Sequence, residues 1–307
     1  MASQFISMQH GESTVQVALV AASRAFMPET FAYEMYFQSL NGFEPIVVSS
    51  YELALRTSAQ VVIVPYGLVP IWSRRPLVLI ADIPSRSTGR FRRLKDILKI
   101  ALNHNPDLAL FLNPYVEASK IAGRANLKLY RGMGFRSDLV LPRGESIEIE
   151  AIYSGSLHRP GVLAELNLLQ EKGLNVSVVG EAKRNDAHPK IEFLGRRTIE
   201  ETYSLYSKAS IGLNIIPNIE PYNYQDSTKL IEYCATGLRV VTSVYPWALD
   251  FEQKSNARFF RIDQSATARE MRDFDYVVPN VQDWEWERVL HNAKLAESIL
   301  LLMKNKS

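Results

Sequence analysis

The sequence contains a single cysteine, Cys234, among 307 residues. One cysteine cannot form a disulfide within the chain or build a cysteine-rich metal site, so a reducing compartment is favoured. No stretch reaches the roughly 18 consecutive apolar residues that are needed to span a bilayer. The first residues lack the basic start, apolar core and small-residue cleavage site of a secretory signal. We therefore expect a cytoplasmic globular protein.

Net charge is also nearly absent: the chain carries +2 at pH 7, which by itself indicates no class of partner. Hydrophobic residues make up 47% of the chain and charged residues 22%, as in ordinary globular proteins. The sequence has neither a short repeat nor a low-complexity segment. Its length is sufficient for two domains of usual size.

Apolar strands alternate with helices in the first half of the chain, which is typical of a parallel sheet covered on both faces. The expected strands are residues 15–21, 44–49, 60–65, 76–82, 108–113 and 139–142, and the expected helices are 28–40, 51–57, 93–103 and 114–123. A polar, turn-forming stretch then begins at Arg143. We place the domain boundary there, so that residues 1–145 form the first domain.

The alternation starts again in residues 146–307, the second expected domain. Its predicted strands are 150–154, 174–179, 190–194, 211–216, 239–243 and 259–262, and its predicted helices are 160–172, 199–207, 226–237 and 284–304. We expect the last helix to pack back toward the first domain. The predicted fold is α/β, with two doubly wound Rossmann-like domains facing across a cleft, at the carboxyl edges of the sheets where such folds bind ligands.

The stretch 226–237 is a short helix whose beginning and end are encoded in the sequence. Asp226, Ser227 and Thr228 are residue types that cap a helix N-terminus, and Gly237 suits the left-handed residue at its end. A helix N-terminus with Lys229 beside it can bind phosphate. Glu232 shares a face with Thr228 and could accept hydrogen bonds from sugar hydroxyls. The alternative is an ordinary capped helix before a strand.

Several segments of the second half resemble, in order and spacing, the GT-B glycosyltransferases, particularly the family 4 type. The matching segments are 153–157, 176–181, 191–195 (leading into 200–209), 212–217 and 228–241. Such a register is specific, and it covers residues 150–243 well. The first half resembles these enzymes only in architecture.

The resemblance implies a site for a nucleotide diphosphate sugar, with UDP the expected nucleotide, in the second domain and an acceptor site in the first. By position, Glu232 would bind the ribose, and Ser227, Thr228 and Lys229 would hold the diphosphate. The strand-end residues Gly195 and Arg196, with Arg197, would lie near the base. Ser156 and Arg159, with His158, would add a basic group at the phosphates.

Tyr224 is a departure from the family 4 pattern, which has a second glutamate at that position, eight residues before Glu232. Residues 226–233 also resemble the inverting glucuronosyltransferases of bacterial exopolysaccharide assembly. The reaction can therefore be retaining or inverting.

The charge that develops on the leaving diphosphate needs fixed positive groups, which Lys229, Arg159 and a helix N-terminus would supply without a metal. The sequence has no Asp-x-Asp cluster at a strand end, and its histidines have no partners at metal-binding spacing. We predict no metal and no other cofactor.

An inverting reaction would need a base for the acceptor hydroxyl. Asp82, at the end of an apolar strand, is the candidate, and capping of the loop at Pro84 is its structural alternative. In a retaining enzyme the donor phosphate could take the proton, and Asp82 would only orient the acceptor. Arg24, after the first strand together with Ser23, is a weaker candidate for acceptor contact.

The segment 74–99 contains eight basic residues against two acidic ones, with Trp72 and Phe91 beside them. Such a segment suits an anionic membrane surface or a lipid-linked acceptor, and Arg86, Arg90, Arg92 and Arg93 are the candidate contacts. The alternatives are a solvated helix face and, without a supporting motif, nucleic acid. We expect no nucleic-acid partner.

The sequence thus predicts a glycosyltransferase that moves a sugar from a nucleotide diphosphate to a glycan or lipid-linked glycan in bacterial surface polysaccharide or glycoconjugate synthesis. We expect it in the cytoplasm or peripherally on the inner face of the cell membrane. The alternative is a non-catalytic nucleotide- or sugar-binding protein of the same two-domain shape.

Overall fold

The structure is a computed structural model of the chain, and it describes residues 14–21, 28–87, 89, 91–118, 125–144, 146–180, 186–263 and 265–306. The chain forms two compact units, residues 1–132 with 286–307 and residues 133–285. Each unit contains one six-stranded sheet whose paired strands run parallel. The predicted fold class, two doubly wound α/β sheets, is confirmed.

The first unit has the strand order β2-β1-β3-β4-β5-β6. These strands are β1 (Val15–Val20), β2 (Phe43–Val48), β3 (Val61–Pro65), β4 (Val78–Ile83), β5 (Leu108–Phe111) and β6 (Leu127–Tyr130). The central strands β1, β3, β4 and β5 are buried along nearly their whole length. Burial on both faces explains why they are apolar runs rather than alternating patterns.

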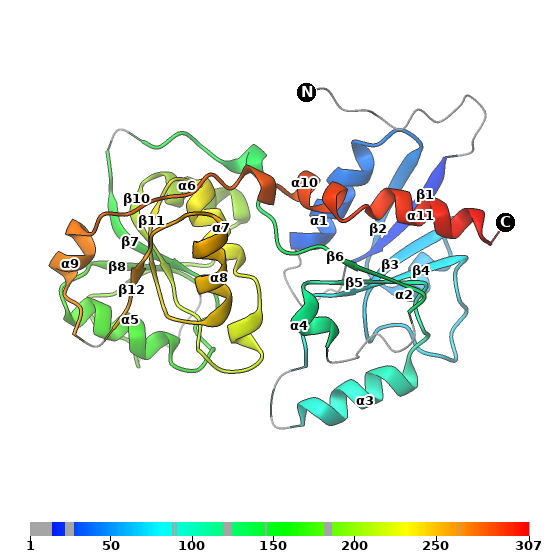
Figure 1. Cartoon of the computed structure of the whole chain (residues 1–307), viewed down its shortest axis with the longest axis horizontal. Coiled ribbons are helices and arrows are strands. Elements are labelled where there is room, and N and C mark those ends of the chain that lie inside the picture. The colour runs from blue at the N-terminus through cyan, green and yellow to red at the C-terminus, as the bar shows by residue number, and fades with distance from the viewer. Residues whose placement is uncertain are drawn as a thin grey trace. The chain divides into compact units, whose positions relative to one another are not determined.

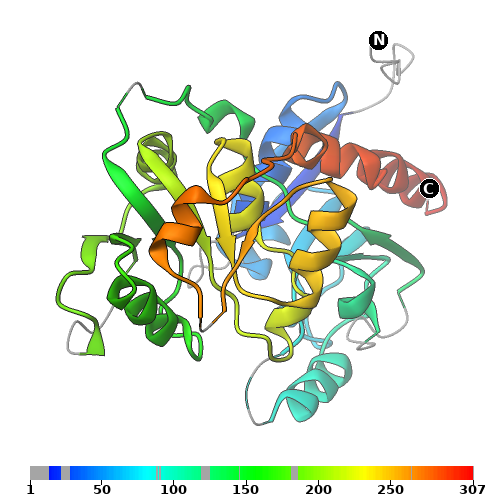
Figure 2. The same cartoon turned by 60° about the vertical axis from the view of Figure 1, so that its left-hand side comes forward.

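The helices of this unit are α1 (Pro28–Gln38), α2 (Tyr51–Ala54), α3 (Arg92–Leu102), α4 (Pro114–Glu117), α10 (Trp286–Asn292) and α11 (Leu295–Lys304). The helices α1 and α2 pack on β1 and β2, α4 packs on β5, and the C-terminal α11 packs on β4. The helix α10 contacts α1. By contrast, α3 stands off the sheet, at the bottom of Figure 1 and of Figure 2.

The second unit has the strand order β12-β11-β10-β7-β8-β9. Its strands are β7 (Ile149–Ser154), β8 (Val176–Val179), β9 (Glu192–Gly195), β10 (Ala209–Asn214), β11 (Arg239–Thr242) and β12 (Phe260–Arg261). Its helices are α5 (Val162–Glu171), α6 (Ile199–Ser207), α7 (Thr228–Ala235), α8 (Pro246–Lys254) and α9 (Ala268–Asp273), with short 3-10 turns at Ser137–Leu139, Tyr222–Tyr224 and Gln282–Trp284.

The helix α7 begins and ends where the sequence predicts. Ser227 is its N-cap and accepts a hydrogen bond from the Leu230 N–H. Gly237 follows the end with a φ of 74°, and the Leu238 N–H donates to the Tyr233 carbonyl. This capping pattern ends a helix with a residue in the left-handed conformation, which explains why residue 237 is glycine.

Residues 133–144 belong to the second compact unit, which begins at Met133, whereas the predicted boundary lies after residue 145. The Phe135 N–H donates to the Trp284 carbonyl, and the Arg143 side chain donates to the carbonyls of Ala209 and Gly237. Residues 286–307 lie with the first unit. The chain therefore crosses between the units twice, at Gly132 and at Glu285.

Four further details differ from the sequence prediction. The expected strand 139–142 is not a strand, and β6 takes its place as the last strand of the first sheet. The expected helix 284–304 is two helices, separated at Lys294, whose φ is 56°. The helices α8 and α9 were not predicted. In the expected helix 114–123, α4 ends at Glu117, and residues 119–124 lie outside the described part.

Candidate functional site

A cavity of about 150 Å³ lies in the second unit, where β7 and β10 end and α7 begins. The carboxyl edge of a parallel sheet is the usual ligand site of such folds, because the loops that leave the strands gather there. Three short segments line the cavity: residues 153–156 with Arg159 after β7, residues 213–216 at the end of β10, and Tyr222 with residues 225–229 before and within the first turn of α7.

The start of α7 is fixed from below by the end of β10. The Ser227 hydroxyl donates to Asn214 Oδ1 over 2.7 Å. The Asn214 amide in turn donates to the Thr242 hydroxyl at 2.9 Å and to the Tyr245 hydroxyl at 3.0 Å. Because the buried Asn214 side chain makes all three of these hydrogen bonds, it holds the N-terminus of α7 against the end of β10.

Lys229 is the cation at the mouth of α7. Its Nζ lies 2.8 Å from Glu232 Oε2, and its side chain is 33% exposed against 4% for Glu232. Burial works to lower the pKa of Lys229, but the Glu232 carboxylate outweighs it and holds that pKa above its usual value. The lysine therefore presents a permanent positive charge to the cavity.

The tyrosine Tyr206 contacts the Glu232 carboxylate, and Tyr233 packs beside it. The Tyr206 hydroxyl lies 3.3 Å from Glu232 Oε2 and 2.9 Å from Ser154 Oγ. The Tyr233 hydroxyl accepts a hydrogen bond from the Ser154 N–H, and its ring packs edge-on against Tyr206 at 5.1 Å. Burial raises the pKa values of Tyr206 and Tyr233 well above their usual value. Both hydroxyls therefore stay protonated and can donate.

Arg159 is the second cation on the cavity. Its guanidinium carbon lies 5.6 Å from the centroid of the Tyr222 ring, a cation–π distance. Asp226 is the acidic residue of the lining, and its Oδ2 accepts a hydrogen bond from the Met133 N–H. The Tyr153 hydroxyl beside them has a pKa that burial raises to about 12. The cavity thus has two cations, neutral hydroxyls and one acid that already accepts a backbone hydrogen bond.

Close backbone packing shapes the same edge. A Cβ on Gly212 would lie 2.4 Å from Tyr233 Cγ, so the ring lies directly on β10 because this residue is glycine. A Cβ on Gly180 would lie 2.7 Å from the Gly155 carbonyl oxygen, which brings the ends of β7 and β8 together.

Most of the predicted donor residues meet at this cavity. Ser156, Arg159, Ser227, Thr228 and Lys229 line it. Glu232 does not line it and reaches it through Lys229, so its predicted contact with a ribose stays a prediction. Gly195 ends β9, the strand at the edge of the sheet, and Arg196 follows it. Neither is among the described lining residues, so their role near the base also stays a prediction.

Sequence reasoning missed several residues of this site. Asn214 and Tyr222 are the main ones, with Gln225 beside them, while Asp226 is expected from the sequence only as a helix cap and Tyr153 only as part of the segment 153–157. Asn214 lies within the segment 212–217 that carries the family resemblance, and a buried asparagine at a strand end was the available signal. No sequence pattern pointed to Tyr222, because the loop that contains it follows no recognisable motif.

Asp82 lies at the end of β4 in the first unit and is buried, with 2% exposure. Arg131 Nε lies 2.9 Å from Asp82 Oδ1, its Nη2 lies 3.3 Å from Oδ2, and the same Nη2 lies 3.3 Å from Glu29 Oε1. The Arg131 side chain is fully buried. Both carboxylate oxygens of Asp82 are thus engaged, which favours a structural role over the predicted one as base.

Three of the predicted acceptor and membrane residues, Arg86, Arg92 and Arg93, lie in the described part of the chain. The Arg86 guanidinium stacks on the Tyr115 ring at 3.6 Å and donates to the Tyr115 carbonyl, so it is held within the fold. Arg92 and Arg93 form the first turn of α3. Arg24 and Arg90 lie outside the described residues.

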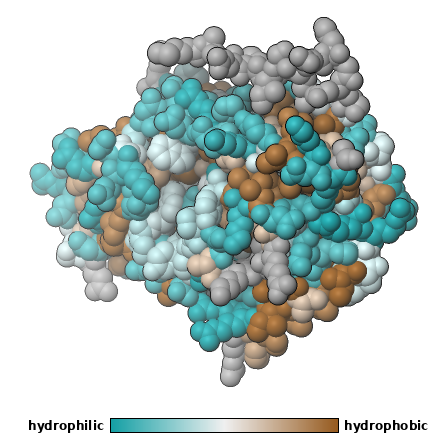
Figure 3. All heavy atoms as spheres, turned by 45° about the vertical axis from the view of Figure 1, so that its right-hand side comes forward, coloured by the Kyte–Doolittle hydropathy of each residue, from teal (hydrophilic) through white to brown (hydrophobic). Residues whose placement is uncertain are grey.

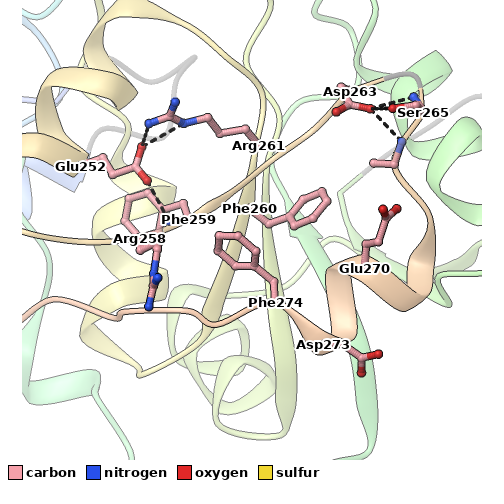
Figure 4. A pocket seen from close by; sticks show the side chains of 11 residues that line it. Glu252, Arg258, Phe259, Phe260, Arg261, Asp263, Ser265, Glu270, Asp273 and Phe274 are labelled. Carbon is pink, nitrogen blue, oxygen red and sulfur yellow. Dashed lines mark hydrogen bonds and ion pairs between the residues drawn. The ribbon is translucent and has the colours of Figure 1, made fainter.

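A larger, open hollow of about 690 Å³ lies beside β12 and α9 (Figure 4). Its charged side chains are engaged with their neighbours: Arg261 pairs with Glu252 at 2.8 Å, Asp263 accepts the Ser265 and Ala266 N–H groups, and Glu270 accepts that of Thr267. None of the predicted donor residues lines it. The smaller cavity, with its convergent cations, is the better candidate site.

The described residues contain no group of three or more His, Cys, Asp or Glu side chains placed to hold a metal ion. No helix in the described part of the chain is long and apolar enough to cross a bilayer.

Solved structures that align with this chain include glycosyltransferases and a UDP-N-acetylglucosamine 2-epimerase. AviGT4, a glycosyltransferase of avilamycin A biosynthesis, aligns with a TM-score of 0.63 and 13% identity over 95% of this chain and 98% of its own. Sucrose-phosphate synthase from Thermosynechococcus elongatus aligns with 0.67 and 11% over 94% and 100%. Anabaena HepE in complex with UDP-glucose aligns with 0.54 and 12% over 95% and 98%. The chain has the GT-B fold.

This likeness shows the fold and not the reaction, since a UDP-N-acetylglucosamine 2-epimerase from Rickettsia bellii also aligns, with a TM-score of 0.55 and 11% identity over 95% of this chain and 98% of its own. No protein-family model matches the sequence. No curated protein matches it either.

Proposed function

We propose that the chain is a glycosyltransferase that uses a UDP-sugar as donor and a glycan or lipid-linked glycan as acceptor, in bacterial surface polysaccharide or glycoconjugate synthesis. One observation carries the donor site: Lys229 and Arg159 converge on a single cavity at the capped N-terminus of α7. Two cations and a helix N-terminus form a site for a diphosphate. The neighbour HepE, solved with UDP-glucose, supports the choice of UDP.

In the transfer step, the bond between the sugar carbon and the diphosphate oxygen breaks, and its electron pair stays on that oxygen. A bond forms between the same carbon and the acceptor hydroxyl oxygen, and the hydroxyl proton passes to a carboxylate base or to the departing diphosphate. Lys229 and Arg159 would stabilise the charge that grows on the diphosphate, and they act more strongly on the transition state than on the bound donor. Glu232 is then a positioning residue, because it touches Lys229 and not the cavity.

The test is calorimetric titration of the protein with UDP, for the parent, Lys229→Gln and Lys190→Gln. Lys190 is exposed, lies in the same unit and does not line the cavity, so it is a matched control. Loss of one charge-assisted contact costs about 1.5–3 kcal/mol, or roughly ten- to hundredfold in Kd. We expect that loss in Lys229→Gln and none in Lys190→Gln. Equal affinity in all three proteins would remove the donor-site assignment.

Transfer itself is measured as movement of labelled sugar from UDP-sugars to an acceptor fraction of bacterial glycolipid. A parent protein that binds UDP but neither releases it from UDP-sugars nor labels any acceptor would favour the binding-protein alternative. Conversion of the donor to an epimeric UDP-sugar without transfer would favour an epimerase.

A further inference from the structure

The helix α3 has no buried residue, although its sequence has a clear apolar side. The side of α3 that meets the protein is mostly polar. Arg92, Asp96 and Lys99 are partly buried, as is Ile100, and the Lys99 side chain reaches within 3.3 Å of where a Cβ on Gly67 would lie. Asn103, just after the helix, is buried: it accepts from the Val69 N–H and donates to the Lys99 carbonyl.

The apolar side of α3 is exposed instead. Leu94, Ile97, Leu98 and Leu102 have exposed fractions of 54%, 59%, 46% and 44%, and Phe91, just before the helix, has 64%. Their spacing of three and four residues places them on one face. An amphipathic helix of a globular protein normally turns this face to the core, so α3 is inverted with respect to its own fold.

The loop 68–73 extends the apolar surface. The Ile71 N–H donates to the Leu102 carbonyl, and Pro70 bridges to Asn103, so this loop is attached to the end of α3. It exposes Leu68 at 45%, Ile71 at 51% and Trp72 at 74%. Together, α3 with Phe91 and the loop 68–73 form what we call the α3 face. Figure 3 shows apolar atoms gathered at the bottom of the molecule, where α3 lies in Figure 1, with polar atoms beside them.

The charges around the α3 face indicate what covers it. By the 100° turn per residue, Arg93 and Lys95 leave the helix on opposite sides of the apolar stripe, and both are exposed. Such side chains can place their methylene groups along an apolar phase while their charges reach anionic headgroups. An exposed tryptophan beside them suits the boundary between headgroups and acyl chains. A second copy of the chain would instead bring like charges face to face.

We propose that the α3 face docks the protein on an anionic lipid bilayer, with the apolar stripe in the headgroup boundary and Arg93 and Lys95 on lipid phosphates. The helix lies on such a surface and does not span it. This binding needs no glycosyl transfer, so it stands or falls separately from the proposed function.

The test is sedimentation of the full chain with phosphatidylcholine vesicles, with and without phosphatidylglycerol. The variants are Leu94→Ser/Ile97→Ser/Leu98→Ser, which removes apolar contact, and Arg93→Gln/Lys95→Gln, which removes charge. Leu301→Ser on α11 is the control, because Leu301 is 55% exposed and lies outside the α3 face. All the changed side chains are exposed, and the circular dichroism spectrum and thermal unfolding of each variant check that it is folded.

The parent should bind the anionic vesicles and bind the neutral ones weakly. Each removed charge should weaken binding roughly fivefold, and added salt should weaken the parent in the same way. The triple serine variant should lose at least tenfold, and Leu301→Ser should match the parent. Equal binding by all variants, or no binding of the parent to anionic vesicles, overturns the proposal. A dimer that only the serine variant abolishes would overturn it in favour of self-association.

Discussion

The buried ion pair at the end of β4 gives the sharpest test of how the first unit is held together. Replacing Arg131 with methionine preserves much of the side-chain volume and removes the charge. It leaves Asp82, with a side chain 2% exposed, and Glu29, with 9%, facing each other without a cation. Breaking a buried pair in this way costs about 3–5 kcal/mol. A domain is stable by only about 5–15 kcal/mol, so the variant should lose a large part of its stability.

The loss should depend on pH. Burial already raises the pKa of Glu29, against the opposing effect of Arg131. Without the arginine that pKa rises further in the folded state. A raised folded pKa gives stability that is present below the unfolded pKa, about 4.3, and is lost as the pH rises through the folded pKa. The deficit of Arg131→Met relative to the parent should therefore be largest near pH 8 and shrink toward pH 5.

The assay is urea denaturation at pH 8 and pH 5, with hydrogen exchange of the β4 and β5 amides to read the first unit by itself. The matched control is Arg258→Met, because Arg258 pairs with Asp275 at side-chain exposures of 50% and 84%. An exposed pair contributes only about 0–1 kcal/mol. A deficit below about 1 kcal/mol for Arg131→Met, or one that does not change with pH, would refute the reasoning.

Two further predictions follow from glycine packing and from a second buried acid. Gly212→Ala should lower the free energy of unfolding, measured by urea denaturation, by about 1–3 kcal/mol, because its Cβ would lie 2.4 Å from Tyr233 Cγ. This loss should nearly vanish when the same change is made in a Tyr233→Ala background. Gly144→Ala is the control and should change stability little, because its Cβ would make only ordinary contacts. Asp107 accepts from the Leu79 N–H and pairs with Arg75 and Lys306, and these contacts outweigh burial and lower its pKa. Asp107→Asn should therefore destabilise the protein by about 1–3 kcal/mol at pH 7, and the difference should fade as the pH drops below about 4; a constant difference would contradict the ion pairs.

The fold was predictable because its central strands are apolar on both faces. The strands β3 and β4 are largely continuous apolar runs, so both can be placed to within two residues from the sequence. By contrast, β6 is an edge strand with alternate residues exposed, so residues 127–130 give only a weak strand pattern. The apolar stretch 139–142 gives a stronger one, and it predicts the last strand in the wrong place. The break at Lys294 has no glycine or proline to announce it.

The candidate site was predictable only where it is local in sequence. Ser227, Thr228 and Lys229 are neighbours, and a capped helix before a strand shows them together. Residues that meet through the sheet could not be found in this way. Asn214 reaches Ser227 across 13 residues, and Arg131 reaches Glu29 across 102 residues. No sequence-spacing rule predicts contacts at such separations, because the order of the strands in the sheet decides which residues meet.

Each unit has a buried carboxylate paired with a cation, Asp82 on β4 and Glu232 on α7, and the exposure of the cation differs between the two pairs. Arg131 is fully buried over Asp82, so nothing outside the fold can take its charge. Lys229 is one-third exposed over Glu232, so an anion can share it while the carboxylate keeps it in place. We expect the closed pair to act on stability and the open pair to act on a ligand, while the predicted role of Asp82 at the acceptor stays a prediction. Arg131→Met should therefore lower stability and leave the UDP affinity of the folded protein unchanged, whereas Lys229→Gln should weaken UDP binding with a smaller effect on stability. If Arg131→Met instead weakened UDP binding as strongly as Lys229→Gln, the division into a structural and a binding pair would be wrong.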